Sequence, residues 1–592
     1  MISRVVLRDE TRRGWFEYTH PVEVIVARSV KDVLPALIDV EHLVRSRLLY
    51  AAGFVTYEAA AGFDDALPAA APGFMPLLCF GLFSARHFMS SLPQSADSAL
   101  GSWQSKTTRD AYEADVRSLR ARIGAGDIYQ VNYTTRFAAP GVLNFEAFIR
   151  MGADAPYGAF IDGPEFSVVS ASPELFFTRQ GHQITCKPMK GTAARGLDSA
   201  ADKHQACWLE TSAKNRAENL MITDMVRNDL SRIAQSASVC TPALFNVEQY
   251  PTVWQMTSTV TARTSASIAD VFRALFPGAS ITGAPKRASM EFINSLENCP
   301  REIYTGAIGV LCPDGDAEFN IAIRTAWSNK REGISGYGSG GGIVWDSDPS
   351  DEFAELQAKT KVLTRVVEKF DLFETMLSDS NQGVHLLERH LARLSASALY
   401  FAFDFDERAA RQAISELVAG LPALPHRVRL VLAKDGAIAL QSSPLAKVGT
   451  AQSVQLAQTA VNAADVTLYH KTSSRKVYER AAGEVNTDCE AVLFNAQGRV
   501  TESVIANLVY RWQGVLYTPP VSDGLLPGTL RSELLACGEI YERSLSLDEL
   551  PSVGDLYLIS ALRGWRRAKI VLPEESENLP ACGWLDEDQI NV

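Results

Sequence analysis

Apolar and polar residues along the chain switch repeatedly between strand-like and helix-like spacing. Aromatic and β-branched residues in 126–137 and 166–178 predict strands, and wider apolar spacing predicts helices over 109–124, over about 202–235 and just after 281. Residues up to about 100 predict a mixed, β-rich lobe. Pro-Asp-Gly at 313–315 predicts a hairpin between strands in 306–326.

A long amphipathic pattern closes this first part of the chain. Residues 352–370 predict one helix that joins two domains without a flexible Gly/Ser linker. The apolar residues expected along one side are Phe353, Leu356, Leu363, Val366, Val367 and Phe370. After about 369 the pattern restarts with a strand, a helix over 386–401 and hairpins that turn at Gly436, Gly498 and Gly514.

Length and composition limit the possible functions. At 592 residues the chain is too long for one core, so two or more domains are expected. The net charge of −12 argues against a nucleic-acid or membrane-surface binder. The nine cysteines are scattered, with no zinc or disulfide pattern, and neither a signal peptide nor an 18-residue apolar run occurs. We therefore expect an intracellular, cytoplasmic protein.

Four features of the first half can carry chemistry, and each also has a plain structural interpretation. Lys190 lies in a Pro-x-Lys-Gly-Thr bend, where it is either a nucleophile or an ordinary solvated turn residue. Arg324 lies on an expected strand, where it grips a carboxylate or faces solvent. Glu352 and Glu355 share a helix face, and with Glu218 they can bind Mg²⁺ or simply complement a helix dipole.

The fourth feature is the glycine run at 336–342. It contains a G-x-G-x-x-G spacing from Gly336 to Gly341 but continues into a strand, which argues against a dinucleotide site. Its backbone N–H groups can still approach an anion closely.

The order and wording of these segments resemble the chorismate-utilising enzymes, a family that includes anthranilate synthase and aminodeoxychorismate synthase component I. The resemblance covers roughly residues 50–368 and implies a large two-layered α/β sandwich. The segments that carry it are SPELFF, PMKGT, AENLMITDMVRNDLSRIA, FPGASITGAPK, IYTGAIG, IAIRT, GSGGGIVWDS and DEFAELQAK.

The resemblance implies that Lys190 attacks C2 of chorismate and that ammonia then enters at C4, because anthranilate synthases carry a small residue at this position. The attack needs a neutral amine, so the surroundings of Lys190 must favour loss of its proton. Glu218, Glu352 and Glu355 would hold Mg²⁺. The expected substrate contacts are Glu174, Thr192, Tyr304, Arg324 and the backbone of Gly340.

Two residues depart from the family pattern. Asn215 stands where anthranilate synthases have a glutamate, which predicts a thinner shell around the metal. Gln255 stands where many relatives have histidine, which puts a proton-donating role there in doubt. Because no G-x-C-x-G nucleophile turn occurs, we expect ammonia to come from a separate glutamine amidotransferase subunit.

The second half places Lys471 upstream of Glu502, a pair that occurs both on protein surfaces and in pyridoxal phosphate sites. The stretches around Arg393, Lys471, Glu502 and Thr529 resemble the fold-type IV pyridoxal-phosphate enzymes over about 370–572. This implies Lys471 as the residue that bonds to pyridoxal 5'-phosphate, Glu502 at its ring nitrogen, and Arg393 with Thr529 at its phosphate. Asn507 is expected to support the glutamate loop, and the family suggests a homodimer.

Together these resemblances imply an α+β chain with a chorismate-binding domain at 1–368 and a fold-type IV domain at 369–592. The implied activities are amination of chorismate at C4 and release of pyruvate to give p-aminobenzoate, a folate precursor. Two alternatives stay open: an anthranilate synthase joined to an aminotransferase-like domain, and a chain in which one half is a non-catalytic binding module.

Overall fold

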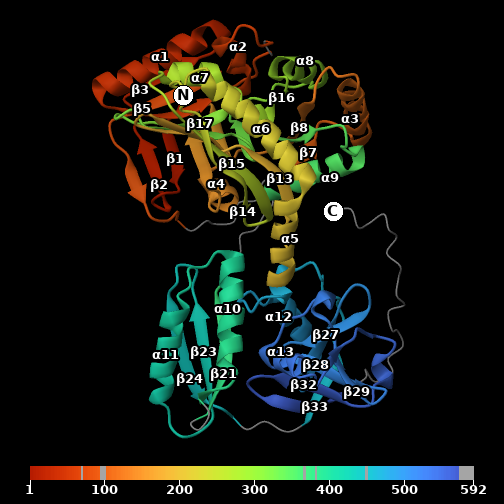
Figure 1. The fold of residues 1–592 in the computed structure, drawn as a ribbon. Helices are drawn as coiled ribbons and strands as arrows, with labels where there is room; N and C mark the ends of the chain where they lie inside the picture. Colours follow the sequence, from red (N-terminus) through yellow and green to blue (C-terminus); the bar gives the residue numbers. More distant parts are fainter. Residues whose placement is uncertain (69–70, 94–101, 364–368, 380–382, 447–450, 572–592) are drawn as a thin grey trace. The chain divides into compact units, whose positions relative to one another are not determined.

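The computed structural model describes residues 1–68, 71–93, 102–363, 369–379, 383–446 and 451–571. The chain forms two compact units (Figure 1). The first unit comprises Met1–Ala194 and Gln205–Val367, and the second comprises Arg195–His204 and Glu368–Val592. The domain boundary expected at 368 and 369 adjoins residues 364–368, which lie outside the described part, so it stays a prediction.

Two ten-stranded sheets make up the first unit within the described ranges, and Figure 1 labels their strands. The first sheet has the order β16-β8-β20-β19-β10-β9-β1-β2-β6, with β7 also paired to β8. Its strands are β1 (Arg4–Asp9), β2 (Gly14–Thr19), β6 (His87–Met89), β7 (Gln104–Ser105), β8 (Gln130–Pro140), β9 (Tyr157–Asp162), β10 (Phe166–Ser172), β16 (Gly283–Ala284), β19 (Thr325–Asn329) and β20 (Ile334–Ile343).

The second sheet has the order β13-β15-β12-β11-β18-β17-β4-β5-β3, with β14 also paired to β15. Its strands are β3 (Glu23–Ala27), β4 (Tyr50–Val55), β5 (Leu78–Phe83), β11 (Leu175–Gln180), β12 (Gln183–Cys186), β13 (Met189–Ala194), β14 (Cys240–Gln249), β15 (Val253–Arg263), β17 (Ala307–Leu311) and β18 (Ala317–Ile321). The helices of the unit are α1 (Val30–Arg47), α2 (Ala60–Phe63), α3 (Arg109–Gly124), α4 (Phe145–Gly152), α6 (Ala213–Ser231), α7 (Ile268–Leu275), α8 (Lys286–Leu296) and α9 (Pro349–Thr360), and α5 (Ser199–Thr211) begins in the second unit.

Apolar residues on both faces of the strands create three layers of core. Val168 packs between the two sheets, whereas its neighbour Val169 packs on the outer face against α3, α4 and α9. The other sheet covers its outer face with α1 and α7. Strands that are buried on both faces have continuous apolar runs in their sequence instead of alternating apolar and polar residues. The predicted two-layered sandwich is therefore confirmed.

Several predicted elements are confirmed and others need correction. The helix at 109–124 and the hairpin of β17 with β18 are present. The helix expected over 202–235 is divided into α5 and α6, because Ser212 caps the start of α6. The single helix expected over 352–370 is wrong: α9 ends at Thr360, and Phe370 packs in the core of the second unit. Val366 and Val367 lie outside the described residues.

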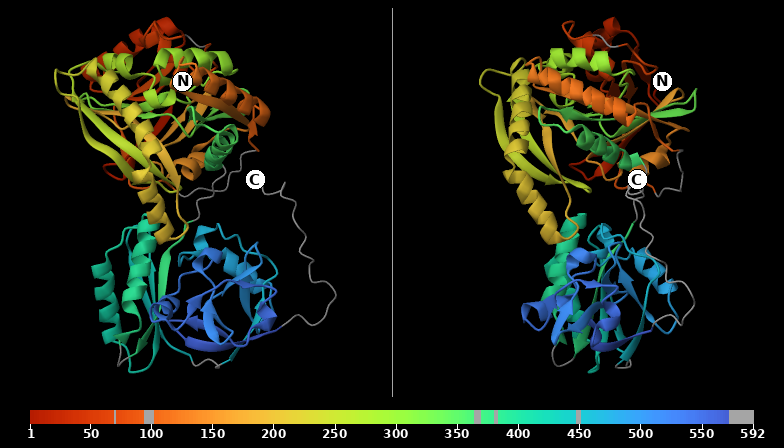
Figure 2. Two further views of the ribbon diagram at one scale, coloured as in Figure 1. Left: turned by 45° about the vertical axis from the view of Figure 1, so that its right-hand side comes forward. Right: turned by 90° about the vertical axis from the view of Figure 1, so that its right-hand side faces the viewer.

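The second unit contains a four-stranded and a nine-stranded sheet within the described ranges. The smaller one has the order β22-β21-β23-β24 and shares a core with α10 and α11. The ribbons of these strands and helices can be followed by their colours in Figure 2. Its elements are β21 (Leu372–Asp379), β22 (Gly383–Val384), α10 (Leu387–Phe401), α11 (Glu407–Ala419), β23 (His426–Leu432) and β24 (Ile438–Pro444).

The larger sheet has the order β30-β29-β28-β32-β33-β25-β26-β27-β31. The three glycine hairpins predicted for the second half are confirmed, one in the smaller sheet and two in the larger one. Their turn residues Gly436, Gly498 and Gly514 have positive φ. The elements are β25 (Ala451–Leu456), α12 (Lys476–Gly483), β26 (Glu490–Phe494), β27 (Arg499–Ser503), β28 (Asn507–Trp512), β29 (Val515–Thr518), α13 (Thr529–Ala536), β30 (Tyr541–Glu542), β31 (Leu545–Ser546), β32 (Leu556–Ser560) and β33 (Gly564–Ile570).

The segment Arg195–His204 follows β13 in sequence but belongs to the second unit. Arg195 forms a two-pronged ion pair with Asp202 at 2.7 Å, and both side chains are buried. The same guanidinium donates to the backbone oxygen of Tyr400 at 3.1 Å and lies over its ring. The Tyr400 ring in turn packs on His470. This segment therefore covers the residue next to Lys471.

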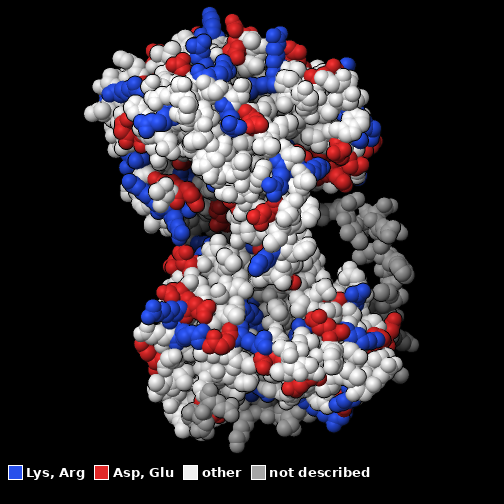
Figure 3. Space-filling model, in the orientation of Figure 1, with Lys and Arg blue, Asp and Glu red and all other residues white. Residues whose placement is uncertain are grey.

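Charged side chains are mixed on the molecular surface. Lys and Arg are interspersed with Asp and Glu on the face drawn in Figure 3, where no continuous basic area is visible. Across the part of the chain that the structure describes, no helix combines the length and apolar character needed to cross a membrane.

Candidate active sites

Lys190 lies in β13, at the edge of the second sheet. The register of β13 against β15 shifts between Met189 and Thr192, so Lys190 and Gly191 form a β-bulge, and Gly191 adopts a φ of 100°. The expected bend is therefore present as a bulge in a strand rather than as a free turn. A bulge re-aims the side chain that it carries.

The Lys190 amine points at the glycine run of β20. Its Nζ lies 3.9 Å from Glu218 Oε2, and a Cβ on Gly342 would clash with it. Glycine is therefore required at 342 for the amine to occupy this position. Both charged side chains are largely buried, at 17% and 19% exposed.

Three more carboxylates lie within electrostatic range of the same amine. Burial raises the pKa of Glu174 to about 7, while the Ser280 hydroxyl and Lys190 oppose the rise. Burial also raises the pKa of Glu352, whereas Lys359 lowers that of Glu355. Lys190 lowers the pKa of both of these glutamates. The structure thus gathers the predicted acidic residues around Lys190.

The donor chemistry of this cluster fits a hard cation that takes part of its shell from water and substrate. In the described ranges, no three His, Cys, Asp or Glu side chains already stand close enough to hold a metal ion. Glu355 is paired with Lys359 at 2.8 Å, and Glu352 accepts from Ser347 at 2.6 Å. An ion would therefore have to displace Lys359 from Glu355 and Ser347 from Glu352.

The backbone of the glycine run is open on one edge. β19 pairs with β20 only over Ile334–Tyr337, while β8 pairs with β20 over its whole length. The carbonyl of Gly340 accepts from Lys359 at 2.7 Å. Because the N–H and C=O of one strand residue point to the same edge, the Gly340 N–H also faces away from β8. This is the backbone donor predicted for a substrate carboxylate.

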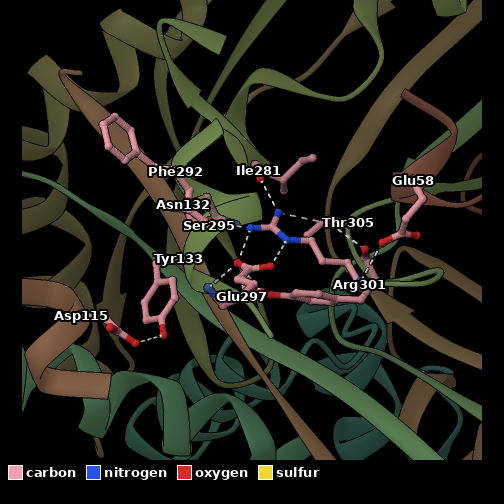
Figure 4. A network of polar contacts seen from close by, with 12 residues as sticks. Glu58, Asp115, Asn132, Tyr133, Ile281, Phe292, Ser295, Glu297, Arg301 and Thr305 are labelled. Atoms are coloured by element: carbon pink, nitrogen blue, oxygen red, sulfur yellow. Dashed lines mark hydrogen bonds and ion pairs between the residues drawn. The ribbon is translucent and has the colours of Figure 1, made fainter. Parts of the chain in front are cut away.

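Tyr304 lies on a loop that the buried Arg301 fixes, and Figure 4 shows the polar contacts of Arg301. Arg301 forms a two-pronged ion pair with Glu297 at 2.6 and 2.7 Å and donates to the backbone oxygens of Asn132 and Ile281. Its backbone N–H donates to Glu58 Oε1 at 2.7 Å. The Tyr304 ring then packs against Gly338, where a Cβ would clash. The loop is therefore rigid and holds Tyr304 against β20.

Arg324 does not lie on a continuous strand, which corrects the sequence prediction. β18 ends at Ile321 in one sheet and β19 begins at Thr325 in the other, so the chain changes sheets between them. Arg324 adopts a φ of 49° in this crossing, and its carbonyl accepts from Ala171 N. The prediction that Arg324 lies on a strand is therefore wrong.

Thr192 and the two residues that depart from the family pattern lie close to the bulge. Thr192 Oγ1 donates to Gln255 Oε1 at 3.0 Å. Asn215 packs against Gly191 and donates to Ser212 Oγ at 2.9 Å. Gln255 therefore contacts Thr192, a predicted substrate residue.

Two residues of this site escaped the sequence analysis. Asn219, fully buried, donates to the backbone oxygens of Lys190 and Met256 and so clamps the bulge onto α6. Gln130 is also fully buried, lies beside Gly342, and has no hydrogen-bond partner at either end of its amide. A buried amide without partners is costly, which indicates that a ligand completes this site. The only sequence signal for Gln130 is that it is a polar residue within a strand of mainly apolar and aromatic residues.

The second site centres on Lys471. Burial lowers the pKa of Lys471 to about 8, and Arg393 and Arg475 act in the same direction. Glu374 and Glu502 oppose the shift, so both carboxylates lie within electrostatic range. The amine also lies 4.8 Å from the centre of the Phe373 ring. The site therefore presents a buried amine whose charged form is disfavoured.

Glu502 is held by three donors. The hydroxyl of Tyr478 and the N–H of Leu526 donate to Oε1, and Asn507 Nδ2 donates to Oε2 at 3.0 Å. Burial nevertheless raises the pKa of Glu502 to about 7. Asn507 thus supports Glu502 directly, and Tyr478 is a contact that the sequence did not indicate.

The two predicted phosphate residues, Arg393 and Thr529, lie on different helices. Thr529 is the first residue of α13. The first backbone hydrogen bond of this helix runs from the N–H of Ser532 to the carbonyl oxygen of Gly528. Free N–H groups at a helix start are suited to phosphate. Arg393, on α10, donates to Pro527 O at 3.2 Å, next to that helix start. The structure thus brings both residues to the start of α13.

Comparison with known proteins agrees with the two units. Residues 89–365 match the family model of chorismate binding enzymes, and residues 371–571 match that of amino-transferase class IV. Aminodeoxychorismate synthase component 1 from Escherichia coli strain K12 is 39% identical over 285 residues, which are 47% of this chain and 62% of the relative. The corresponding protein from Salmonella typhimurium strain LT2 is 41% identical over 45% of this chain and 59% of its own length.

Solved structures of chorismate-utilising enzymes share the fold of the first unit. Anthranilate synthase component I from Streptococcus pneumoniae TIGR4 superposes with a TM-score of 0.53 at 25% identity, covering 60% of this chain and 92% of that protein. The chain spans about three fifths of the length of the curated relatives that it matches.

Proposed function

We propose that this chain, in which a chorismate binding enzyme domain is joined to an amino-transferase class IV domain, converts chorismate to p-aminobenzoate in two steps. The first unit would aminate chorismate at C4, and the second would release pyruvate from the product. The names of the relatives support the first step. The convergence of acidic groups on Lys190 is the observation that carries the proposal.

In the first step, Lys190 Nζ bonds to C2 of the ring while the C4 hydroxyl leaves as water after protonation. Ammonia then bonds to C4 as the C2–nitrogen bond breaks, and the lysine is restored. Glu174, whose raised pKa of about 7 allows a protonated carboxyl, would supply the proton to the leaving hydroxyl. Tyr304, Arg324 and the Gly340 N–H bind the enolpyruvyl carboxylate, and Thr192 lines the ring pocket.

Glu218, Glu352 and Glu355 would hold Mg²⁺ in this site. The ion supplies positive charge that neutralises the ring carboxylate and orients the substrate. Glu355 would then give up its contact with Lys359, and Glu352 would give up its contact with Ser347.

In the second unit, Lys471 would bond to pyridoxal 5'-phosphate, Glu502 would pair with its ring nitrogen, and Arg393 with Thr529 would bind its phosphate. The cofactor supplies an electron sink next to the substrate amine. Lys471 then takes the proton from C4 of the substrate. The bond from C3 to the enolpyruvyl oxygen breaks, the leaving group gains a proton to become pyruvate, and the ring becomes aromatic.

Three further proposals concern the surroundings of the enzyme. Ammonia would come from a separate glutamine amidotransferase subunit, the kind of partner that a component 1 requires. Unpaired cysteines throughout the described residues support a reducing, cytoplasmic location. A homodimer formed through the second half stays a prediction.

Product analysis tests both steps. Purified protein is incubated with chorismate, ammonium and Mg²⁺, with and without pyridoxal phosphate, and the products are separated by chromatography. We expect p-aminobenzoate and pyruvate when the cofactor is present. Anthranilate would instead indicate amination at C2, and unchanged chorismate would indicate a non-catalytic first unit.

Two lysine variants assign the steps. Lys190→Ala should abolish amination at C4, and Lys471→Ala should let the aminated intermediate accumulate. Lys187→Ala is the matched control for the first, because Lys187 lies three residues earlier and pairs with Glu248 at 2.6 Å. Release of p-aminobenzoate at the parent rate by both Lys190→Ala and Lys471→Ala would contradict the assigned roles.

A further inference from the structure

A fully buried carboxylate, Glu374, lies behind the predicted phosphate residues of the second unit. Its side chain is 2% exposed. Arg393 donates to both of its oxygens, at 2.9 and 2.6 Å, and His390 Nδ1 lies 2.7 Å from Oε2. Although burial raises the pKa of Glu374, Arg393 and His390 lower it to about 2. Glu374 is therefore a fixed anion with two cationic or polar partners.

Glu374 determines how Arg393 can meet a ligand. Of the five N–H donors that an arginine carries, two point at Glu374 and one at Pro527 O, which leaves two. Because the planar guanidinium is held at its other edge, the remaining donors have a fixed direction. Arg393 is thus oriented before any ligand arrives.

His390 connects the same carboxylate to the other predicted phosphate residue. Its Nδ1 faces Glu374, and its Nε2 lies 3.4 Å from Thr529 Oγ1. Both His390 and Thr529 are buried, at 1% and 5% exposed. Since a carboxylate accepts only, Nδ1 carries a proton and donates to Glu374.

We propose that Glu374 and His390 are positioning residues for the phosphate of bound pyridoxal phosphate. This inference rests on the cofactor role proposed for the second unit. Glu374 fixes the guanidinium of Arg393, and His390 sets the direction of the Thr529 hydroxyl. Neither residue touches the reacting atoms.

The direction of the Thr529 hydroxyl follows from hydrogen-bond polarity. A His390 ring without a proton on Nε2 accepts the Thr529 hydrogen and leaves no hydroxyl donor for a phosphate oxygen. With a proton on Nε2, His390 donates to Thr529 Oγ1, and the Thr529 hydrogen is free to reach the phosphate.

Cofactor affinity tests the inference independently of activity. The full-length protein without cofactor is titrated with pyridoxal phosphate and with pyridoxal, which lacks the phosphate, and binding is followed by absorbance. His390→Gln should weaken pyridoxal phosphate roughly tenfold or more, as expected for a hydrogen bond to a charged group. Binding of pyridoxal should stay within about twofold of the parent value.

A double variant tests whether His390 acts through Thr529. Thr529→Ala alone should weaken pyridoxal phosphate by a similar factor, and adding His390→Gln should cause little further loss. His426→Gln is the control, because His426 is also buried but bonds to Leu424 O in the smaller sheet. Thermal unfolding of each variant confirms that the fold persists.

The outcomes separate the two proposals. A parent protein that binds neither compound overturns the cofactor role of the second unit. A parent that binds pyridoxal phosphate, with a His390→Gln variant that loses affinity for both compounds equally, overturns the positioning role. Independent, multiplicative losses from His390→Gln and Thr529→Ala overturn it as well.

Discussion

The low pKa of Lys471, about 8, is a residue-scale property with a kinetic consequence. Only a neutral amine bonds to the aldehyde of pyridoxal phosphate, and an ordinary lysine is neutral only above about pH 10.4. The rate at which cofactor-free protein takes up pyridoxal phosphate should therefore rise with pH and level off above about pH 8. Stopped-flow absorbance measures this rate. A rate that keeps rising through pH 10 would show that Lys471 is not shifted.

The sequence draws attention to single residues whose chemistry differs from that of their neighbours, and the roles assigned to them stay predictions. Lys190, between Pro188 and Gly191, was identified because a cation in a bend is unusual. Asn219 and His390 were missed, because a polar residue in a helical pattern reads as a solvated side chain. Their roles depend on burial, which only the packing of distant elements creates.

The fit between β20 and Lys190 gives a prediction at the scale of elements. Gly342→Ala should displace the lysine amine, because the added Cβ would clash with Nζ. A displacement near 1 Å costs a reaction roughly a hundredfold in rate, so C4 amination should fall by about that factor. The thermal midpoint should change little, because the two nearest atoms to the new Cβ, Lys190 Nζ and Gln130 Nε2, are both ends of flexible side chains. Steady-state rates and thermal unfolding measure the two effects.

Gly554→Ala is the control for this substitution, because the space around Gly554 is open. Normal amination by Gly342→Ala would mean that Lys190 can react from another position, and the proposed geometry would be wrong.

Elements that are marked by a local sequence feature, such as a turn glycine, were predicted. Elements whose bounds depend on packing against distant parts of the chain were not. Glycine turns marked the hairpins of the second half, because positive φ is required there. The path of the chain at Arg324 could not be predicted, since a crossing between sheets looks like one continuous strand in sequence. The helix at 352–370 was overextended because an apolar stripe does not reveal which core its last residue enters.

At the scale of the whole molecule, the segment Arg195–His204 predicts that the second half is incomplete alone. A fragment of residues 369–592 lacks the segment that covers Tyr400 and His470. Its thermal midpoint should therefore be roughly 5–15 °C below that of the same unit in the full-length protein. Tethering 195–204 to the fragment through a flexible linker should restore most of the loss. A scrambled ten-residue segment is the control. Equal midpoints for all three proteins would show that the segment contributes nothing to stability.

The path of this segment also limits how such a protein can be rebuilt. Arg195, Asp202 and Tyr400 form one buried set, although Tyr400 is encoded some two hundred residues downstream. If either half were exchanged for that of a homologue at a cut near residue 368, Arg195 would come from one parent and Tyr400 from the other. Chimaeras would keep their stability only when the ten-residue insert travels with the second half, so the exchangeable unit consists of residues 195–204 together with that half.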